Sequence, residues 1–246
     1  MANSRRDFFK KSLGAAAVLV SAKAVEAAVC QVTARQTSGP FIPNDFPFRE
    51  PNEGAPYFPV ADNNADLTQI DGHAKGASGQ VIYVHGQVVD QRCEPVANAT
   101  VYLWQADEHG HYNHAEDPNV KSTADLDPDF QYRGVVSTDA QGRFGFKTIK
   151  PKYYPLDDSG QLVRTAHLHV AVLHPQTERL VTQTYFEGDV LEDIERIRQL
   201  NANDIILSPR GEILPELRPL IIEFRREAGV LDGVVGHVTL TVRRRS

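Results

Sequence analysis

From residue 81 onward, the chain is a succession of short runs of strand-forming residues separated by turn-forming ones. Val81–Val89 is mostly β-branched and apolar, a polar turn follows, and Ala99–Gln105 alternates between apolar and polar residues. Short strands at this spacing indicate antiparallel sheets rather than alternating strand and helix units. Further runs of this kind, of which we expect the last two to pair, are Gly134–Ser137, Arg143–Thr148, Ala166–Leu173, Leu180–Phe186, Leu220–Arg226 and His237–Arg244.

Three other segments complete the expected fold. Thr138–Gly142 has the composition of a hairpin turn between two of the strands. Val190–Leu200 has charged and apolar residues at helical spacing, which predicts one short surface helix. Residues 29–80 are rich in Gly, Pro, Asn and Asp, which predicts a long irregular N-terminal arm. The expected fold is mainly β, with residues 81–246 forming one antiparallel β-sandwich of the immunoglobulin or transthyretin-like type.

The first residues have a different character. The stretch 4–10, Ser-Arg-Arg-Asp-Phe-Phe-Lys, has the paired arginines of a twin-arginine export signal, with an ordinary basic amphipathic N-terminus as the alternative. Leu13–Val20 is apolar but too short to anchor the chain in a bilayer. Small residues follow as far as Ala24 or Ala27, so we expect residues 1–28 to be a signal peptide. This route exports folded proteins, which predicts a periplasmic or secreted protein.

Charge narrows the range of partners. Residues 29–246 contain 21 Lys and Arg against 30 Asp and Glu, a net charge of −9. An acidic chain argues against nucleic acid and against an anionic membrane surface as partners. A chain of this length can bury one sizeable core.

Cys30 and Cys93 are the two cysteines of the chain. In an exported protein an isolated pair of cysteines predicts one disulfide. Closing a loop of about 60 residues in this way stabilises the folded state by roughly 4 kcal/mol in the chain-entropy model. Two unrelated free thiols are the alternative.

Residues 164–169 read Arg-Thr-Ala-His-Leu-His and carry the clearest chemical signal. Alternate side chains of a strand share a face, so His167 and His169 point the same way and form half of a metal site. No Asp or Glu follows at short spacing, but tyrosines in distinctive settings occur at Tyr112 and in Tyr153-Tyr154-Pro155. Two imidazoles and two phenolates suit a hard, high-valent cation, and Fe(III) is the biological one that phenolate favours.

These residues resemble those of the intradiol ring-cleavage dioxygenases, most closely the protocatechuate 3,4-dioxygenase type and its exported relatives. The resemblance runs from Gln36 to Asp189. A lone His-x-His pair would be a weak signal, whereas three blocks in the family's order are a specific one. The blocks are Leu103-Trp104-Gln105-Ala106 through Tyr112, Thr148-Ile149-Lys150-Pro151 through Pro155, and Arg164 through His169.

The resemblance implies a role for each residue. The ligands of Fe(III) would be Tyr112, Tyr154, His167 and His169. Tyr154 is favoured over Tyr153 because the family's ligand directly precedes Pro, and it would also accept a proton from the substrate. Arg164 would stabilise negative charge that develops on the substrate ring.

Weaker matches concern the pocket and the cysteines. Gln183 matches a pocket glutamine, and Gly39 with Pro40 matches the arm beside the substrate. A Cys-x-Pro pattern shared with exported relatives favours the Cys30–Cys93 disulfide over free thiols.

The implied activity is cleavage of a catechol-type ring by O2, between its two hydroxyl-bearing carbons, to give a cis,cis-muconic acid without reductant or organic cofactor. The partners would be a small aromatic diol and O2. Assembly into a homo-oligomer is compatible with the sequence. Leu156 and Thr165 stand where the family usually has Trp and Pro, which limits the prediction of the substrate. A protocatechuate-like substrate is favoured by architecture, because we expect no counterpart of the helical N-terminal domain of the catechol 1,2-dioxygenase branch. The alternatives are a non-catalytic exported transthyretin-like binding module, and a non-catalytic subunit of a hetero-oligomeric dioxygenase.

Overall fold

The computed structural model describes residues 29–44, 46–48, 63–157, 159, 162–187 and 194–245. The predicted signal peptide and the first part of the predicted helix lie outside these residues. The described chain is mainly β, as predicted. Its strands are β1 (Val81–Asp90), β2 (Thr100–Trp104), β3 (Arg133–Ser137), β4 (Arg143–Ile149), β5 (Tyr154–Pro155), β6 (Val163–Arg164), β7 (His167–Leu173), β8 (Leu180–Glu187), β9 (Ile221–Arg225) and β10 (Val234–Val242). Its helices are α1 (Ile194–Asn203) and the 3-10 turns η1 (Thr123–Asp125) and η2 (Pro215–Leu220).

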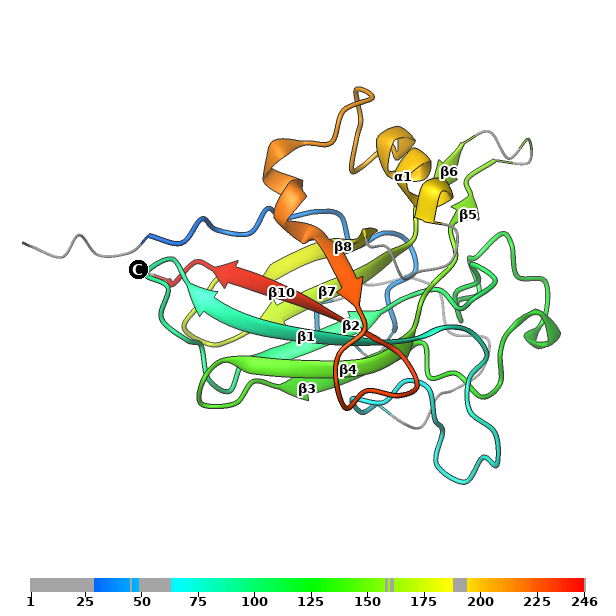
Figure 1. Cartoon of the computed structure of the whole chain (residues 1–246), viewed down its shortest axis with the longest axis horizontal. Helices are drawn as coiled ribbons and strands as arrows, with labels where there is room; N and C mark the ends of the chain where they lie inside the picture. The colour runs from blue at the N-terminus through cyan, green and yellow to red at the C-terminus, as the bar shows by residue number, and fades with distance from the viewer. Residues whose placement is uncertain are drawn as a thin grey trace, which may run out of the picture.

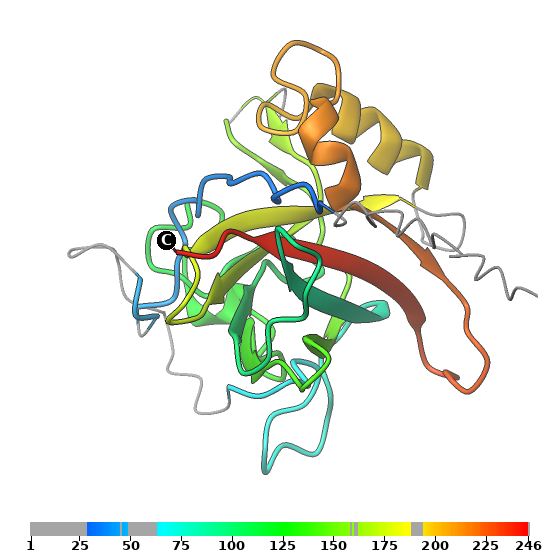
Figure 2. The ribbon, with the colours of Figure 1, turned by 90° about the vertical axis from the view of Figure 1, so that its left-hand side faces the viewer.

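Eight of the strands form one sheet that nearly closes on itself, in the order β3-β2-β7-β8-β9-β10-β1-β4 (Figure 1). One buried core draws apolar side chains from both halves of this sheet, for example Leu103 and Leu168 from one half and Ile82 and Leu240 from the other. Figure 2 shows the curved backbone of this sheet from the side. The immunoglobulin or transthyretin-like type of the fold stays a prediction.

The predicted hairpin between β3 and β4 is wrong, although the turn itself forms. The amide of Gly142 donates to the carbonyl of Asp139 (2.9 Å) within a tight turn. The strands nevertheless separate, since β3 pairs with β2 and β4 pairs with β1. The amide of Thr138 bonds to Ala99 (2.9 Å) and the carbonyl of Gly142 accepts from Val88 (2.8 Å). The strand before the turn therefore pairs with β2 and the strand after it pairs with β1, so the turn connects the two halves of the sheet.

The pairing is antiparallel in most of the sheet but parallel between β1 and β10 and between β8 and β9. The predicted closing pair, β9 with β10, is confirmed as antiparallel. Strand β10 begins earlier than predicted, because Val234 and Val235 are buried and Gly236 is a packing residue rather than a loop residue. A Cβ at Gly236 would lie 2.7 Å from Cε1 of Phe224, so only glycine fits there without displacing the ring.

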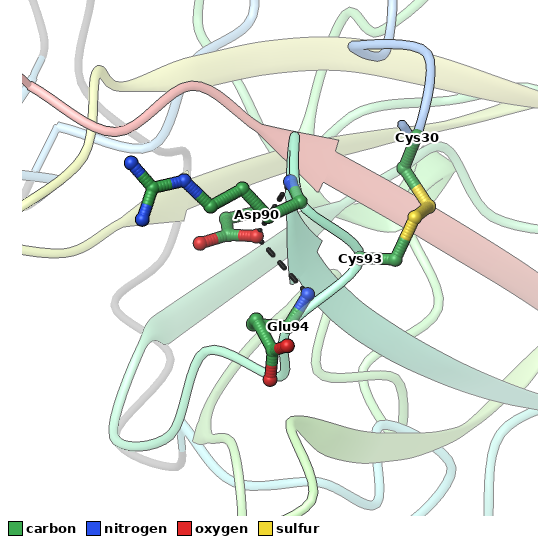
Figure 3. The surroundings of a disulfide bond; sticks show 5 residues. Cys30, Asp90, Cys93 and Glu94 are labelled. Atoms are coloured by element: carbon green, nitrogen blue, oxygen red, sulfur yellow. Dashed lines mark hydrogen bonds between the residues drawn. A yellow bond between two sulfur atoms is a disulfide. The ribbon is translucent and has the colours of Figure 1, made fainter. Parts of the chain in front are cut away.

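A disulfide joins Cys30 to Cys93, the pair that the sequence predicts, with the two Cα atoms 5.2 Å apart. Figure 3 shows it beside the turn that follows β1, where the backbone amide of Glu94 donates to the buried carboxylate of Asp90 (3.0 Å). Burial alone would raise the pKa of Asp90, but hydrogen bonds from Arg244 and from backbone amides outweigh it and lower that pKa. The start of the arm is thus fastened to a rigid turn.

From the disulfide, the arm crosses the sheet towards β7. The amide of Thr33 donates to Thr241 of β10 (3.0 Å), and the amide of Gln36 donates to Val181 of β8 (2.9 Å). Later in the arm, the amide of buried Leu67 donates to Lys147 of β4 (2.8 Å). The described parts of the arm are therefore hydrogen-bonded to the sheet and follow its surface.

The helix α1 and the β5–β6 hairpin lie together at one end of the molecule in both ribbon views (Figures 1 and 2). The predicted helix is present, and its described part runs to Asn203, three residues beyond the predicted end. No helix in the part of the chain that the structure describes combines the length and the hydrophobicity of a membrane-spanning segment.

We expect the Cys30→Ser, Cys93→Ser double variant to lose about 2–5 kcal/mol of unfolding free energy, because the unfolded chain is no longer closed into a loop. Denaturant unfolding followed by circular dichroism measures the loss, with dithiothreitol-treated wild type as the control. Thiol titration of denatured, unreduced wild type should find no free thiol. Two reactive thiols per chain would contradict the bridge.

Candidate functional site

The two histidines of the His-x-His pair lie on β7, between β2 and β8 in the sheet. His167 and His169 are both buried and face the same way, and their Nε2 atoms are 3.2 Å apart. The prediction from strand alternation, that the two imidazoles share one face, is therefore confirmed.

The two rings are held by different means. Nδ1 of His167 donates a hydrogen bond to the carbonyl oxygen of Thr165 (2.7 Å), so Nε2 of the neutral ring carries the free lone pair. Nδ1 of His169 makes no hydrogen bond with any described residue. The His169 ring is instead stacked on the indole of Trp104, with centroids 4.9 Å apart and planes 10° apart. Trp104 is its partner in the β2–β7 register.

Tyr112 reaches the histidines from the loop that follows β2. Its backbone amide donates to the carboxylate of Asp117 (2.7 Å), which anchors this part of the loop. Its hydroxyl lies 3.2 Å from Nε2 of His167, and Phe41 of the arm packs on its ring at 4.8 Å between centroids. Tyr112 is buried, and an aromatic side chain of the arm covers it.

Tyr154 joins the cluster from the short strand β5. Its ring centroid is 5.7 Å from that of Tyr112 and 5.7 Å from that of His167. Tyr153 does not join the cluster: its ring is only half-buried, and the guanidinium of Arg196 lies over it at 5.3 Å. The structure thus brings Tyr112, Tyr154 and the two histidines together, and leaves Tyr153 outside.

Arg164 lies opposite Tyr154 in the β5–β6 register and is buried. Its Nε donates to Asp204 (2.9 Å) and its Nη2 donates to Oε1 of Gln183 (2.7 Å). Gln183 uses its other end as well, because Nε2 donates to the carbonyl of Thr37 in the arm (2.8 Å). Gln183 therefore links Arg164 to the arm.

The arm brings Gly39 against the site. Gly39 has φ +71°, and a Cβ built on it would lie 3.1 Å from Cε1 of His169. Pro40, the next residue, is exposed. Of the two arm residues predicted to border the substrate, Gly39 contacts the cluster, while Pro40 faces solvent.

Burial controls the charge of the cluster. It raises the pKa of Tyr112 well above its usual value and also raises that of Tyr154, although the Arg164 charge acts in the opposite direction on both. Burial lowers the pKa of His167 and His169 well below the usual value, and the Arg164 charge adds to this. Burial alone would lower the pKa of Arg164, but the Asp204 carboxylate outweighs it and raises that pKa. Burial thus favours the neutral forms of the two tyrosines and the two histidines, and the positive charge of Arg164 acts on all four.

The donor set fits a metal ion. The hydroxyl of Tyr112 and the Nε2 atoms of His167 and His169 form two contacts of 3.2 Å. Donor atoms that share one cation at about 2.1 Å lie about 3.0–3.4 Å apart at right or tetrahedral angles. Phenolate selects hard, high-valent cations such as Fe(III). The described residues contain no group of three or more His, Cys, Asp and Glu side chains suited to a metal, so a centre here depends on tyrosine.

Comparison with known proteins identifies the family. Residues 53–213 match the model of a protein family described as Dioxygenase, about two thirds of the chain. The chain is also 42% identical over 114 residues to the protocatechuate 3,4-dioxygenase beta chain of Burkholderia cepacia, covering 46% of this chain and 47% of that one. The chain belongs to the intradiol ring-cleavage dioxygenases. Members of this enzyme family are generally Fe(III)-dependent, in agreement with the donor set.

Other intradiol dioxygenases give the same result. The 6-chlorohydroxyquinol 1,2-dioxygenase of Cupriavidus pinatubonensis is 35% identical over 157 residues, 59% of this chain and 50% of that protein. The chain spans about half the length of these two curated relatives. The solved intradiol dioxygenase of Tetranychus urticae shares the fold, with a TM-score of 0.58, 21% identity, and coverage of 88% of this chain and 98% of that one.

Sequence reasoning missed several residues that hold the site. Trp104 was recognised as part of a motif but not as the stacking partner of His169. Asp204 and Asn201, which bond to Arg164 and Thr165, gave no signal in the sequence. Their partners are distant along the chain, and a single Asp or Asn near a helix end is more often a surface residue. Trp104 could have been found by pairing the two strand patterns in register.

We expect Gly39→Ala to weaken metal binding, because its new methyl group would press on the His169 ring. Gly72→Ala is a matched control, since Gly72 also has a positive φ (+84°) but a Cβ there meets nothing within 4 Å. Both variants should lose about 1–2 kcal/mol of unfolding free energy from backbone strain. Titration of each purified variant with iron, followed by visible absorbance, measures the difference in metal affinity. Equal affinities would show that Gly39 does not support the site.

Proposed function

We propose that this protein is an Fe(III)-dependent dioxygenase that cleaves the ring of a catechol-type diol with O2 between the two hydroxyl-bearing carbons. The observation that carries the proposal is the convergence of Tyr112, Tyr154, His167 and His169 in one buried cluster beside the Arg164 guanidinium. The product would be a cis,cis-muconic acid. No reductant is required, because the diol supplies all four electrons that reduce O2.

In this proposal, the two tyrosines and two histidines hold the metal. Bound Fe(III) would supply a Lewis acid that binds the diol oxygens and accepts electron density from the ring. Tyr154 would hold the cation as a phenolate, take one proton from the substrate on its oxygen, and so become the neutral hydroxyl that burial favours. The guanidinium of Arg164, held by Asp204 and Gln183, faces the negative charge that develops on the ring. Gln183 and Gly39 border this space from β8 and from the arm, so we keep them as substrate-side residues.

A protocatechuate-like diol is the favoured substrate. Its support is the 42% identity to the protocatechuate 3,4-dioxygenase beta chain, against 35% to a 6-chlorohydroxyquinol 1,2-dioxygenase. The hydroxyquinols are a second candidate substrate class, because the Cupriavidus relative is named a 6-chlorohydroxyquinol 1,2-dioxygenase. Oxygen uptake with protocatechuate, catechol and hydroxyquinol separates these substrate classes.

The alternatives are a non-catalytic binding module and a non-catalytic subunit. Neither would need two tyrosines and two histidines in one buried cluster.

We also propose that the protein is exported folded by the twin-arginine route and acts in the periplasm or outside the cell. The Cys30–Cys93 disulfide supports an oxidising compartment. Fractionation of cells that express the full chain, with and without Arg5→Lys, Arg6→Lys, tests this part.

The first test concerns the ligands. Tyrosinate coordination should colour the iron-loaded protein red-brown, so Tyr154→Phe should shift its visible band, because a phenolate donor is lost. Tyr153→Phe is the matched control and should leave the band unchanged, since Tyr153 lies outside the cluster. Absorption spectra of the three proteins measure this. A band lost in Tyr153→Phe and kept in Tyr154→Phe would contradict the ligand assignment.

The second test concerns the reaction. We expect Arg164→Ala to keep the iron and its colour while kcat for oxygen uptake falls about 10²–10³-fold, because a fixed charge that acts mainly in the transition state is lost. An oxygen electrode with the favoured diol measures kcat. Absence of uptake by iron-loaded wild type with every diol tried would overturn the proposed function.

A further inference from the structure

We propose that Asp204 and Asn201, at the end of α1, are positioning residues. Asp204 fixes Arg164 directly, and both residues fix His167 through the peptide of Thr165. This inference rests on the proposed function, because Arg164 and His167 act in that reaction. It assigns a role in the site to a segment that contacts Arg164 and Thr165 rather than the four proposed ligands.

The carboxylate of Asp204 is fixed on both sides. Its Oδ2 accepts from Nε of Arg164 (2.9 Å) and from the backbone amide of Thr165 (2.9 Å). Its Oδ1 accepts from the backbone amides of Ile206 and Leu207, each at 2.9 Å. The side chain is fully buried. Four hydrogen bonds satisfy this carboxylate, so it can move only together with the backbone of both segments.

Asn201 holds the same peptide by a second contact. The hydroxyl of Thr165 donates to Oδ1 of Asn201 (2.6 Å), while Nδ2 of Asn201 donates to the carbonyl of Phe186 in β8 (3.0 Å). Asn201 is itself buried. Thr165 stands where the family usually has proline, which has neither an amide hydrogen nor a hydroxyl. The amide contact with Asp204 therefore requires a residue other than proline, and the contact with Asn201 requires a side-chain hydroxyl.

Thr165 connects Asp204 and Asn201 to the proposed ligand His167. Its amide and hydroxyl bond to Asp204 and Asn201, and its carbonyl oxygen accepts from Nδ1 of His167 (2.7 Å). Every polar group of Thr165 is thus used, and the acceptor that sets the tautomer of His167 belongs to a peptide that α1 holds in place.

Arg164 is fixed in the same manner. Asp204 accepts a hydrogen bond from Nε of Arg164, and Gln183 accepts one from Nη2. The guanidinium is therefore held by the segment after α1 and by β8. The charge of Arg164 lies close enough to act on both Tyr154 and His167. A guanidinium held in this way needs little reorganisation when charge develops on a substrate.

The test uses Asp204→Asn, with Asp90→Asn as the matched control. Asp90 is also a buried carboxylate that bonds to an arginine (Arg244) and to two backbone amides, those of Arg92 and Glu94, but at the disulfide end of the chain. We expect both variants to lose stability and to keep the visible band of the iron-loaded protein. Only Asp204→Asn should lower kcat, by about 10²-fold, with KM changed less than threefold.

A double-mutant cycle separates positioning from general destabilisation. If Asp204 acts through Arg164, adding Asp204→Asn to Arg164→Ala should lower kcat no further. If Asp204 only supports folding, the two losses should multiply. Thr165→Val, which removes one hydroxyl and keeps the side-chain shape, covers the case in which Asp204→Asn does not fold. It should lower kcat about tenfold while the protein stays folded.

The outcomes distinguish this inference from the proposed function. Iron-loaded wild type that consumes no oxygen with any diol overturns the proposed function and this inference together. Active wild type with multiplicative losses in the cycle, or with unchanged kcat in Asp204→Asn or in Thr165→Val, overturns the inference alone. A non-additive cycle with the band intact supports it.

Discussion

The hydrogen bond from Nδ1 of His167 to the carbonyl of Thr165 is the constraint on which the site depends. It leaves Nε2 as a buried hydrogen-bond acceptor, 3.2 Å from Nε2 of a second imidazole and 3.2 Å from the hydroxyl of a phenol. Buried polar atoms are costly unless they are satisfied, and the surrounding protein must be rigid to keep the Tyr112 hydroxyl within hydrogen-bonding distance of Nε2. Strand β7 sets the spacing of the two rings, Trp104 sets the plane of His169, and Thr165 sets the tautomer of His167.

Much of that rigidity comes from segments that are not part of the sheet. The arm starts at the disulfide and is hydrogen-bonded to β10 and β8. It then passes His169 at Gly39 and packs on Tyr112 through Phe41. The segment after α1 holds Arg164 from the other side. The site is therefore enclosed by two irregular segments, and each is attached to the sheet by backbone or buried hydrogen bonds.

The strands could be predicted from the sequence because alternating apolar residues report burial locally. The pairing could not: Thr138–Gly142 encodes a reversal of the chain, but the partners of β3 and β4 are set by distant strands. The ligand set came from resemblance of three ordered blocks, and the structure brings the four side chains together. Asp204 and Asn201 could not be predicted, since their importance lies in contacts with residues more than thirty positions away.

The parallel pairing of β1 with β10 has a consequence for how the protein is made. Ile82 of β1 lies beside Val234 of β10. The hydrogen bonds along this edge of β1 therefore cannot form until β10 is present. A nascent chain emerging from the ribosome cannot close the sheet until nearly all of the domain has been synthesised, because such non-local pairing must await both strands. Until then, the apolar face of β1 needs protection from aggregation. The arm that borders the cluster of histidines and tyrosines is hydrogen-bonded to β10, so its final position also depends on the last strand.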